Sequence, residues 1–196
     1  MTQEEVEAKF RGFIAGEWWS NAVGLLFEAY GSDVLRFLHG FLRDPDAAEE
    51  VFSQLSLKMC EEISRFRGEC SGKVWFFYKA RYAALDWVRA PQRRLERRLE
   101  TREMSRLDEL VNQVRSQTRP FMMTDVKDKF EVLRSQLEPE ERMLLVLYKY
   151  QEKSSLEVAE AMSSPEDVWT SSKVRKRWQR LKLKIAKMAK RQGLMS

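Results

Sequence analysis

Hydrophobic positions recur at helical spacing along almost the whole chain, and no segment shows the period of two that is typical of a strand. The pattern predicts helices over residues 3–17, 22–42, 45–66, 72–89, 139–151, 155–162 and 171–191. The five prolines stand between these segments or at their first positions, where a missing N–H is tolerated. The sequence therefore predicts an all-α fold.

The predicted helices form two groups, separated by an Arg-rich stretch in which leucines recur loosely. We expect two small helical domains over residues 1–90 and 124–196, joined by a linker over residues 91–123. Thr124 is the expected cap of the second domain. A short helix, a turn and a long helix end the chain, and this order predicts a helix-turn-helix.

The net charge of +5 conceals a strong alternation along the chain. Residues 1–62 carry a net charge of −7, and residues 63–119 carry +7. Residues 120–167 carry −5, whereas residues 168–196 hold ten basic side chains and no acidic one. Two separate basic segments indicate two contacts with a polyanion, and the acidic segments indicate a second, basic partner. Segregated charge on solvated helices is the alternative interpretation.

Composition argues against several classes of protein. The chain has one histidine, two cysteines with nine residues between them, no phosphate-binding glycine loop and no nucleophile motif, so we expect no enzyme, no metal site and no cofactor. No apolar run approaches the roughly 20 residues that span a bilayer, and the acidic N-terminus lacks a secretory pattern. We therefore expect a cytoplasmic protein that does not contact membranes, with free thiols.

One stripe of the helix predicted over residues 72–89 combines aromatic and charged side chains. At 100° per residue, the stripe consists of Trp75, Lys79, Tyr82, Asp86 and Arg89. The opposite side, expected to pack into a core, consists of Phe77, Ala80, Ala84 and Val88. Rings that stack on bases, at about 1–3 kcal/mol per base, and cations that attract phosphates suit unpaired nucleic acid. A structural helix with half-buried rings is the other interpretation.

The last predicted helix is amphipathic and strongly basic. Its apolar stripe consists of Val174, Trp178, Leu181, Ile185 and Met188. The basic side chains at its start are Lys173, Arg175, Lys176, Arg177 and Arg180. In a helix-turn-helix this part of the second helix contacts base edges in the major groove, so these five are the candidates for duplex DNA. An anionic membrane or an acidic protein is the alternative partner.

Three motifs carry a family resemblance. The first is LRDPDAAEE at residues 42–50, and the second is FRGE at residues 66–69 followed by Trp75, Ala80, Asp86 and Arg89. The third is LEPEERMLLVL at residues 137–147, followed by LEVAE at residues 156–160 and then by basic residues of the last helix. In this order and spacing the motifs resemble those of extracytoplasmic-function sigma factors, a group of the bacterial sigma-70 family, and mark the chain as a divergent member.

The resemblance implies a role for each part of the chain. The first domain would bind core RNA polymerase through the matching positions Glu50, Ser53, Gln54 and Leu57. Residues 72–89 would capture the melted strand of the minus-ten promoter element, and residues 124–196 would read the minus-thirty-five element as duplex. The implied partners are core RNA polymerase, promoter DNA and, as the family often has one, an anti-sigma factor. The implied function is promoter recognition, strand opening and transcription initiation.

Some residues depart from the family pattern. Tyr82 stands where Asn is usual, and a phenol cannot make the paired hydrogen bonds of an amide, so base preference should differ. Ser53, Ser56 and Cys60 replace larger residues of the polymerase-binding helix, and the turn before residue 174 is longer than usual. These departures keep two alternatives open: a sigma-derived DNA-binding regulator without initiation activity, and a helical protein-interaction module.

Overall fold

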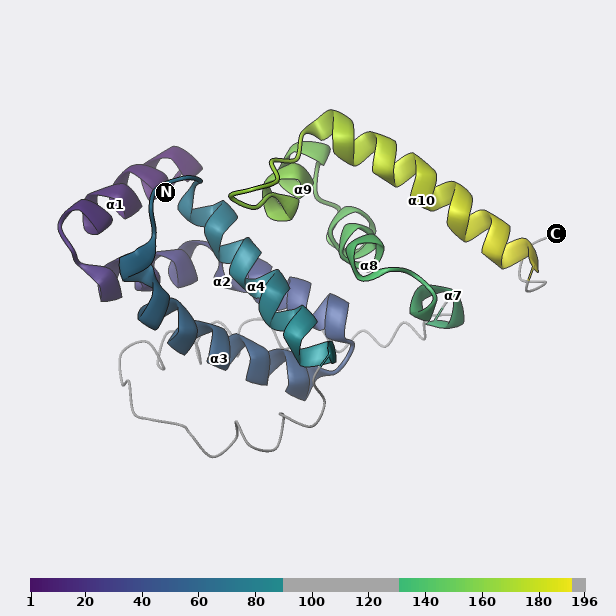
Figure 1. Ribbon diagram of the computed structural model, residues 1–196, viewed down its shortest axis with the longest axis horizontal. Helices are drawn as coiled ribbons and strands as arrows, with labels where there is room; N and C mark the ends of the chain where they lie inside the picture. Colours follow the sequence, from purple (N-terminus) through teal and green to yellow (C-terminus); the bar gives the residue numbers. More distant parts are fainter. Residues whose placement is uncertain (90–130, 192–196) are drawn as a thin grey trace. The chain divides into compact units, whose positions relative to one another are not determined.

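The computed structural model describes residues 1–89 and 131–191, and every regular element in these residues is a helix (Figure 1). The all-α prediction is therefore confirmed for the described part of the chain. The chain divides into two compact units, Met1–Met123 and Thr124–Ser196. The predicted linker over residues 91–123 and the predicted cap Thr124 lie outside the described residues. The roles assigned to the two domains remain predictions.

In the described residues of the first unit, 1–89, the chain forms four α-helices and one short 3₁₀ turn. They are α1 (Gln3–Ala15), α2 (Trp19–Leu42), α3 (Pro45–Glu62), η1 (Ile63–Arg65) and α4 (Gly72–Arg89). The helix predicted over residues 3–17 ends earlier because Glu17 adopts a φ of 58°, which a helix cannot contain. The helix predicted over residues 45–66 tightens into η1 after Glu62.

Side-chain caps fix where these helices begin. The Thr2 hydroxyl accepts the N–H of Glu5, and the Glu5 carboxylate accepts the N–H of Thr2, which satisfies two N–H groups that the helix leaves unpaired. At α3 the Asp44 carboxylate accepts the N–H of Ala47 at 3.1 Å, and Pro45 occupies the first helical position. The chain therefore turns between α2 and α3 within a few residues, as the sequence predicted.

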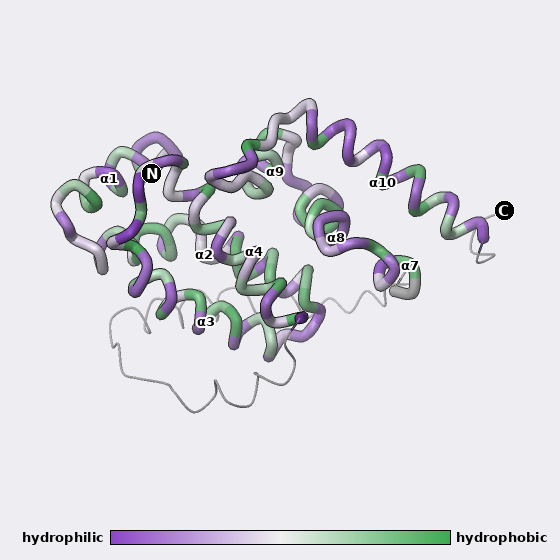
Figure 2. The backbone as a smooth tube through the Cα atoms, viewed as in Figure 1, coloured by the Kyte–Doolittle hydropathy of each residue, from purple (hydrophilic) through white to green (hydrophobic). Residues whose placement is uncertain are grey.

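The core of the first unit is an aromatic cluster around Phe27 of α2. The ring of Phe27 lies 5.2 Å from that of Phe52 on α3 and 4.7 Å from that of Phe76 on α4, between ring centroids. All three side chains are fully buried, each worth about 1.5–3 kcal/mol of hydrophobic transfer free energy. Figure 2 shows the corresponding hydrophobic positions along α2, α3 and α4. This cluster sets how α3 and α4 are rotated against α2.

Helix α1 is held against the beginning of α4 by a close approach at Gly72. A Cβ atom at this position would lie 2.8 Å from Cδ1 of Phe10 and 2.9 Å from Cδ2 of Leu26, closer than packing allows. The Gly72 N–H also donates to the Glu7 carboxylate at 2.8 Å. Beside it, the buried Lys73 donates to the side-chain oxygen of Gln3. Gly72 is therefore required by space and not by backbone conformation.

One exposure predicted from sequence in α3 is wrong. The helical period and the charge of Glu49 predict that it faces water together with Glu50, but its exposed fraction is 5%. The position is two residues from the buried Val51 and next to the buried Ala48, so it lies at the margin of the apolar face and is covered by the packing of that face. The polar surface of α3 is correspondingly narrower than its sequence indicates.

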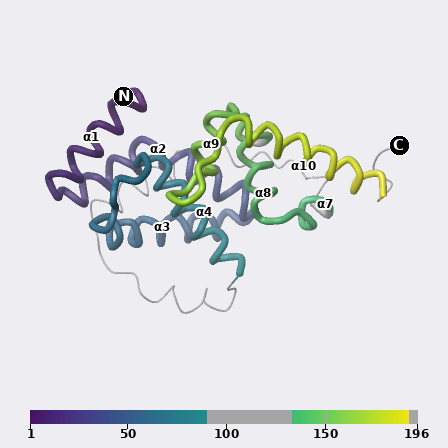
Figure 3. Tube along the Cα trace, turned by 45° about the horizontal axis from the view of Figure 1, so that its top comes forward, coloured from purple at the N-terminus to yellow at the C-terminus, as the bar shows by residue number. Residues whose placement is uncertain are grey.

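The second unit contains α7 (Glu131–Ser135), α8 (Pro139–Leu145), the π-helical turn η2 (Val146–Tyr150), α9 (Ser155–Met162) and α10 (Ser171–Arg191). The bounds of α9 and α10 agree with the sequence prediction, whereas residues 139–151 divide into α8 and η2. Capping boxes at Glu138 and Ser154 start α8 and α9. Helix α9 lies beside the beginning of α10, as Figures 1 and 3 both show.

The apolar stripe of α10 packs on the shorter helices of its unit. Val174 and Leu181 are buried, and the Trp178 ring stacks on Tyr148 at 4.9 Å between centroids. Purple and green positions alternate along α10 in Figure 2, as expected for an amphipathic helix with one covered face. Among the described residues, no helix combines the length and apolar character needed to cross a lipid bilayer.

Changing Gly72 to alanine should destabilise the first unit, because the added methyl group overlaps the buried ring of Phe10. Overpacking of this kind costs about 1–3 kcal/mol of the free energy of unfolding, which urea denaturation of the full chain would measure. Gly24→Ala is the matched control, since no atom lies within 4 Å of its added Cβ. Because Gly24 lies inside α2, in its second turn, this change should stabilise by about 0.5–1 kcal/mol. Equal effects of the two changes would contradict the close approach at Gly72.

Candidate nucleic-acid interface

The first turn of α4 is covered, so the exposed part of the predicted stripe begins further along the helix than the sequence indicates. Trp75 is only 6% exposed, and its ring lies 5.5 Å from that of Phe66, in the loop that leads into the helix. The expectation that Trp75 faces solvent is therefore wrong in this structure. The helical period placed it correctly on the stripe with Tyr82, but a period cannot show that a loop crosses the first turn of a helix.

Lys79 also belongs to this covered end of the stripe. Its ammonium forms an ion pair with the Glu62 carboxylate, at the end of α3. The same ammonium lies 5.6 Å above the Trp75 ring and 5.7 Å from the centroid of the Tyr78 ring. Lys79 thus links α3 to α4 and packs on two aromatic faces. In the free protein its charge is already paired with a carboxylate.

The open end of α4 carries the aromatic and charged surface that remains. Tyr82 is 48% exposed, and its ring lies 4.6 Å from that of the half-buried Tyr78. Asp86 and Arg89 continue the exposed stripe toward the end of the helix. Tyr78 was not among the residues predicted from sequence, although its spacing of four residues from Tyr82 is the signal that would have found it. The candidate surface for unpaired bases is therefore the Tyr78–Tyr82 pair with Arg89.

The four candidate polymerase contacts, Glu50, Ser53, Gln54 and Leu57, are all half-buried on α3. The Gln54 amide donates to the Glu50 carboxylate at 2.6 Å, so these two polar groups form one unit on the helix surface. Ser56 is 1% exposed, and its hydroxyl donates to the Ser53 carbonyl. The small side chain at position 56 therefore changes the core and not the outer surface of α3.

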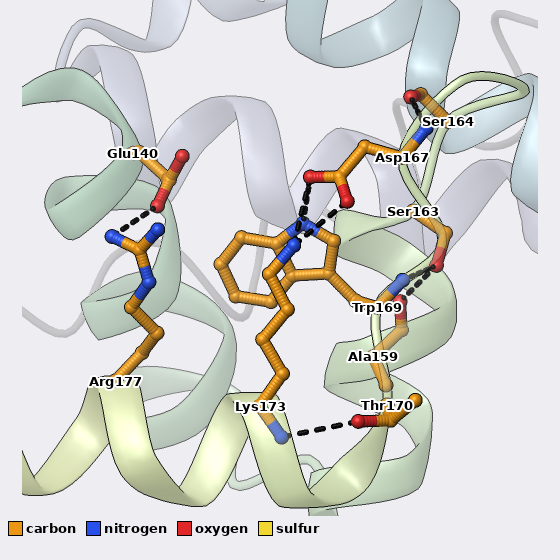
Figure 4. A network of polar contacts seen from close by, with 9 residues as sticks. All are labelled: Glu140, Ala159, Ser163, Ser164, Asp167, Trp169, Thr170, Lys173 and Arg177. Atoms are coloured by element: carbon orange, nitrogen blue, oxygen red, sulfur yellow. Dashed lines mark hydrogen bonds and ion pairs between the residues drawn. The ribbon is translucent and has the colours of Figure 1, made fainter.

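The turn between α9 and α10, residues 163–170, is ordered by its own hydrogen bonds (Figure 4). The Ser163 hydroxyl donates to the Ala159 carbonyl at 2.8 Å and accepts the N–H of Trp169 at 2.9 Å. The Thr170 hydroxyl accepts the N–H of Lys173 at 3.2 Å and caps α10. Since Trp169 is 6% exposed, its indole anchors the end of the turn to the unit.

Two of the five predicted duplex contacts are paired with acids in this structure. The Lys173 ammonium lies 2.7 Å and 2.9 Å from the two carboxylate oxygens of Asp167, and 4.6 Å from the centroid of the Trp169 ring. The Arg177 guanidinium lies 3.2 Å from the Glu140 carboxylate of α8 and 5.8 Å from the same ring centroid. Trp169 and Asp167 were not predicted as site residues, because neither is basic.

The other three predicted duplex contacts are exposed. Arg175, Lys176 and Arg180 form no ion pair with an acidic side chain in the described part of the chain. An open groove of about 300 Å³ lies along the beginning of α10. Its lining residues are Thr170, Ser172, Lys173, Lys176, Arg177 and Arg180. Four of these six are cations, so the groove is suited to a phosphodiester backbone.

Titration of the site follows from these contacts. The hydrogen bond from Lys173 holds the pKa of the Asp167 carboxyl below its ordinary value, and the Trp169 indole N–H adds to this effect. Asp167 is therefore ionised at neutral pH.

The two cysteines of the first unit have raised pKa values. Burial raises the pKa of the Cys70 thiol to about 11 and also raises that of Cys60. Both cysteines are weak nucleophiles at neutral pH, and the described residues contain no cluster of three metal-ligating side chains.

Part of this chain matches known proteins in sequence. The family described as Sigma-70 region 2 matches residues 26–94, which include α3 and α4. The chain is also similar to the ECF RNA polymerase sigma factor SigX of Bacillus subtilis (strain 168), with 26% identity over 138 residues, covering 70% of this chain and 71% of that protein. The candidate residues on α3 and α4 lie within the family match, whereas those on α10 lie outside it.

Changing Ser163 to alanine should destabilise the second unit, because the hydroxyl both donates to Ala159 and accepts from Trp169 in a buried setting. Leaving a buried donor unsatisfied costs about 1–3 kcal/mol, which urea denaturation of the full chain would measure. Ser172→Ala removes an exposed hydroxyl from the same unit and should stay within about 0.5 kcal/mol of the parent chain. A loss no larger than that of the control would show that the turn does not depend on Ser163.

Proposed function

We propose that this chain, a divergent sigma-70-type protein of the extracytoplasmic-function group with a role in transcription initiation, binds core RNA polymerase and directs promoter recognition and strand opening. The observation that supports the proposal most is the Sigma-70 region 2 match, which contains both candidate surfaces of the first unit. Catalysis would belong to the polymerase, and this chain would supply specificity.

Polymerase binding is proposed for the outer surface of α3. Glu50 and Gln54 form one polar unit there, with Leu57 beside them at helical spacing. The segment that surrounds them is acidic, since residues 1–62 carry a net charge of −7. A basic surface of core polymerase would complement this charge and accelerate association. An anti-sigma factor would be a second partner that competes for the same face.

Strand capture is proposed for the open end of α4. Tyr82 offers an exposed ring for an unstacked base beside the half-buried Tyr78, and Arg89 lies on the same stripe for a phosphate. Tyr82 is the base-contacting residue in this proposal. Two neighbours on α4 have a supporting role in this proposal. Lys79 is paired with Glu62, and Trp75 packs on Phe66. The negative charge of Asp86 would repel a phosphate from the part of the stripe between Tyr82 and Arg89.

Duplex binding is proposed for the groove along α10. Helix α9, the turn and α10 have the order of a helix-turn-helix, and the cations stand at the beginning of the second helix, where such proteins contact DNA. Arg175, Lys176 and Arg180 are exposed, whereas Lys173 and Arg177 are paired with acids.

The second candidate function, a regulator that binds DNA without initiation, is favoured by the small side chains of Ser53 and Cys60 on α3.

The purified chain should elute with core RNA polymerase from its source organism as a stoichiometric complex on size exclusion at moderate salt. Glu50→Lys should weaken that complex about tenfold, because it reverses the one negative charge among the four proposed contacts. Glu28→Lys makes the same charge reversal at an exposed position of α2 and should leave the complex intact. Absence of any complex with native core would favour the regulator without initiation activity.

Tyr82→Ala should weaken binding to single-stranded DNA about tenfold and binding to duplex DNA little, since it removes one stacking ring, worth about 1–3 kcal/mol. Fluorescence anisotropy with matched single-stranded and duplex probes would measure both affinities. Tyr82→Phe keeps the ring and should retain most of the single-strand affinity. An equal loss with both probes, or no loss with either, would refute the assignment of this surface.

A further inference from the structure

The turn before α10 places one carboxylate at the edge of the basic groove. The Ser164 hydroxyl accepts the N–H of Asp167 at 3.0 Å, and the Ser164 N–H donates to the Asp167 carbonyl, also at 3.0 Å. These two bonds fix the backbone at position 167. The side chain then points toward Lys173, as Figure 4 shows.

Lys173 is the groove residue that this carboxylate engages. Both carboxylate oxygens lie within 2.9 Å of the Lys173 ammonium, in the arrangement that two phosphate oxygens would take. The Trp169 indole N–H donates to the same carboxylate at 3.0 Å, and the ring lies under the ammonium. Asp167 therefore occupies the ammonium group with which a backbone phosphate would have to compete.

We propose that Asp167 restrains sequence-independent binding to duplex DNA by competing with backbone phosphate for Lys173. This inference rests on the proposed binding of duplex by α10 and names a residue that limits that binding. Because sequence-independent affinity comes from phosphate contacts and the ions that they release, one cation withheld by an internal carboxylate lowers it for every duplex alike. Contacts with base edges depend on other groups and are not lowered by this competition.

The charges of the turn favour this role over simple stabilisation. Asp167 is the last acidic residue of the chain and precedes ten basic residues. The Asp167 side chain is 60% exposed, where an ion pair contributes little to folding, about 0–1 kcal/mol. The fold is instead held at this point by Ser163 and the buried Trp169. Removing the charge should therefore change binding much more than stability.

The test compares Asp167→Asn with Glu166→Gln in the full chain. Both changes remove one negative charge from adjacent exposed positions, but the Lys173 ion pair is formed by Asp167. Affinity for a random-sequence duplex is measured by fluorescence anisotropy over a series of salt concentrations. Asp167→Asn should bind about fivefold more tightly near 0.15 M salt, with a salt slope steeper by about 0.9, as for one added phosphate contact. Glu166→Gln should leave the slope unchanged.

Two further variants separate this inference from the proposed function. Arg180→Ala should weaken duplex binding and make the slope shallower by about 0.9, which tests the groove itself. Adding Lys173→Gln to Asp167→Asn should abolish the gain. If Asp167→Asn binds no more tightly than Glu166→Gln, or keeps its gain without Lys173, the inference is overturned while the groove stands. If neither the parent chain nor Asp167→Asn binds duplex, both ideas fail.

Discussion

The aromatic cluster around Phe27 is the packing constraint on which the first unit depends, because α2, α3 and α4 each contribute a ring to it. A helix that inserts one large ring into such a cluster cannot rotate about its axis without opening a cavity. Phe76 therefore sets which side chains of α4 face outward. Tyr82 and Arg89 are exposed as a consequence of a contact on the opposite side of the same helix.

In the second unit, a helix with many positive charges packs on a small core. Mutual repulsion along α10 is offset where acids of neighbouring elements reach it, as Glu140 reaches Arg177 and Glu141 reaches Lys184 at 2.6 Å. These acids do not reach Lys176 and Arg180, which line the groove. Electrostatic balance within the unit thus divides the cations into those that hold the helix and those that remain available.

The sequence predicted the helices well, because their periods and caps are local features. Asp44 with Pro45, Pro139 and Ser154 are start signals of the sequence at which the structure begins α3, α8 and α9. It misjudged Trp75 and Glu49, whose burial depends on a crossing loop and on packing between helices, neither of which a period contains. It missed Tyr78 although the spacing of four residues from Tyr82 is a local signal, and it missed Asp167 because the Lys173 partner is brought to that carboxylate only by the folded turn.

The hydrogen bond between Ser163 and the N–H of Trp169 closes the turn before α10 at its base. The residues between them form a loop whose two ends are held together by this hydrogen bond. At the tip of the loop, Glu166 and Val168 are exposed. Substitutions or small changes of length at the tip can therefore alter the surface beside the groove without moving the helix that lines it. Evolution can adjust the charge and shape of this surface separately from the stability of the unit that carries it.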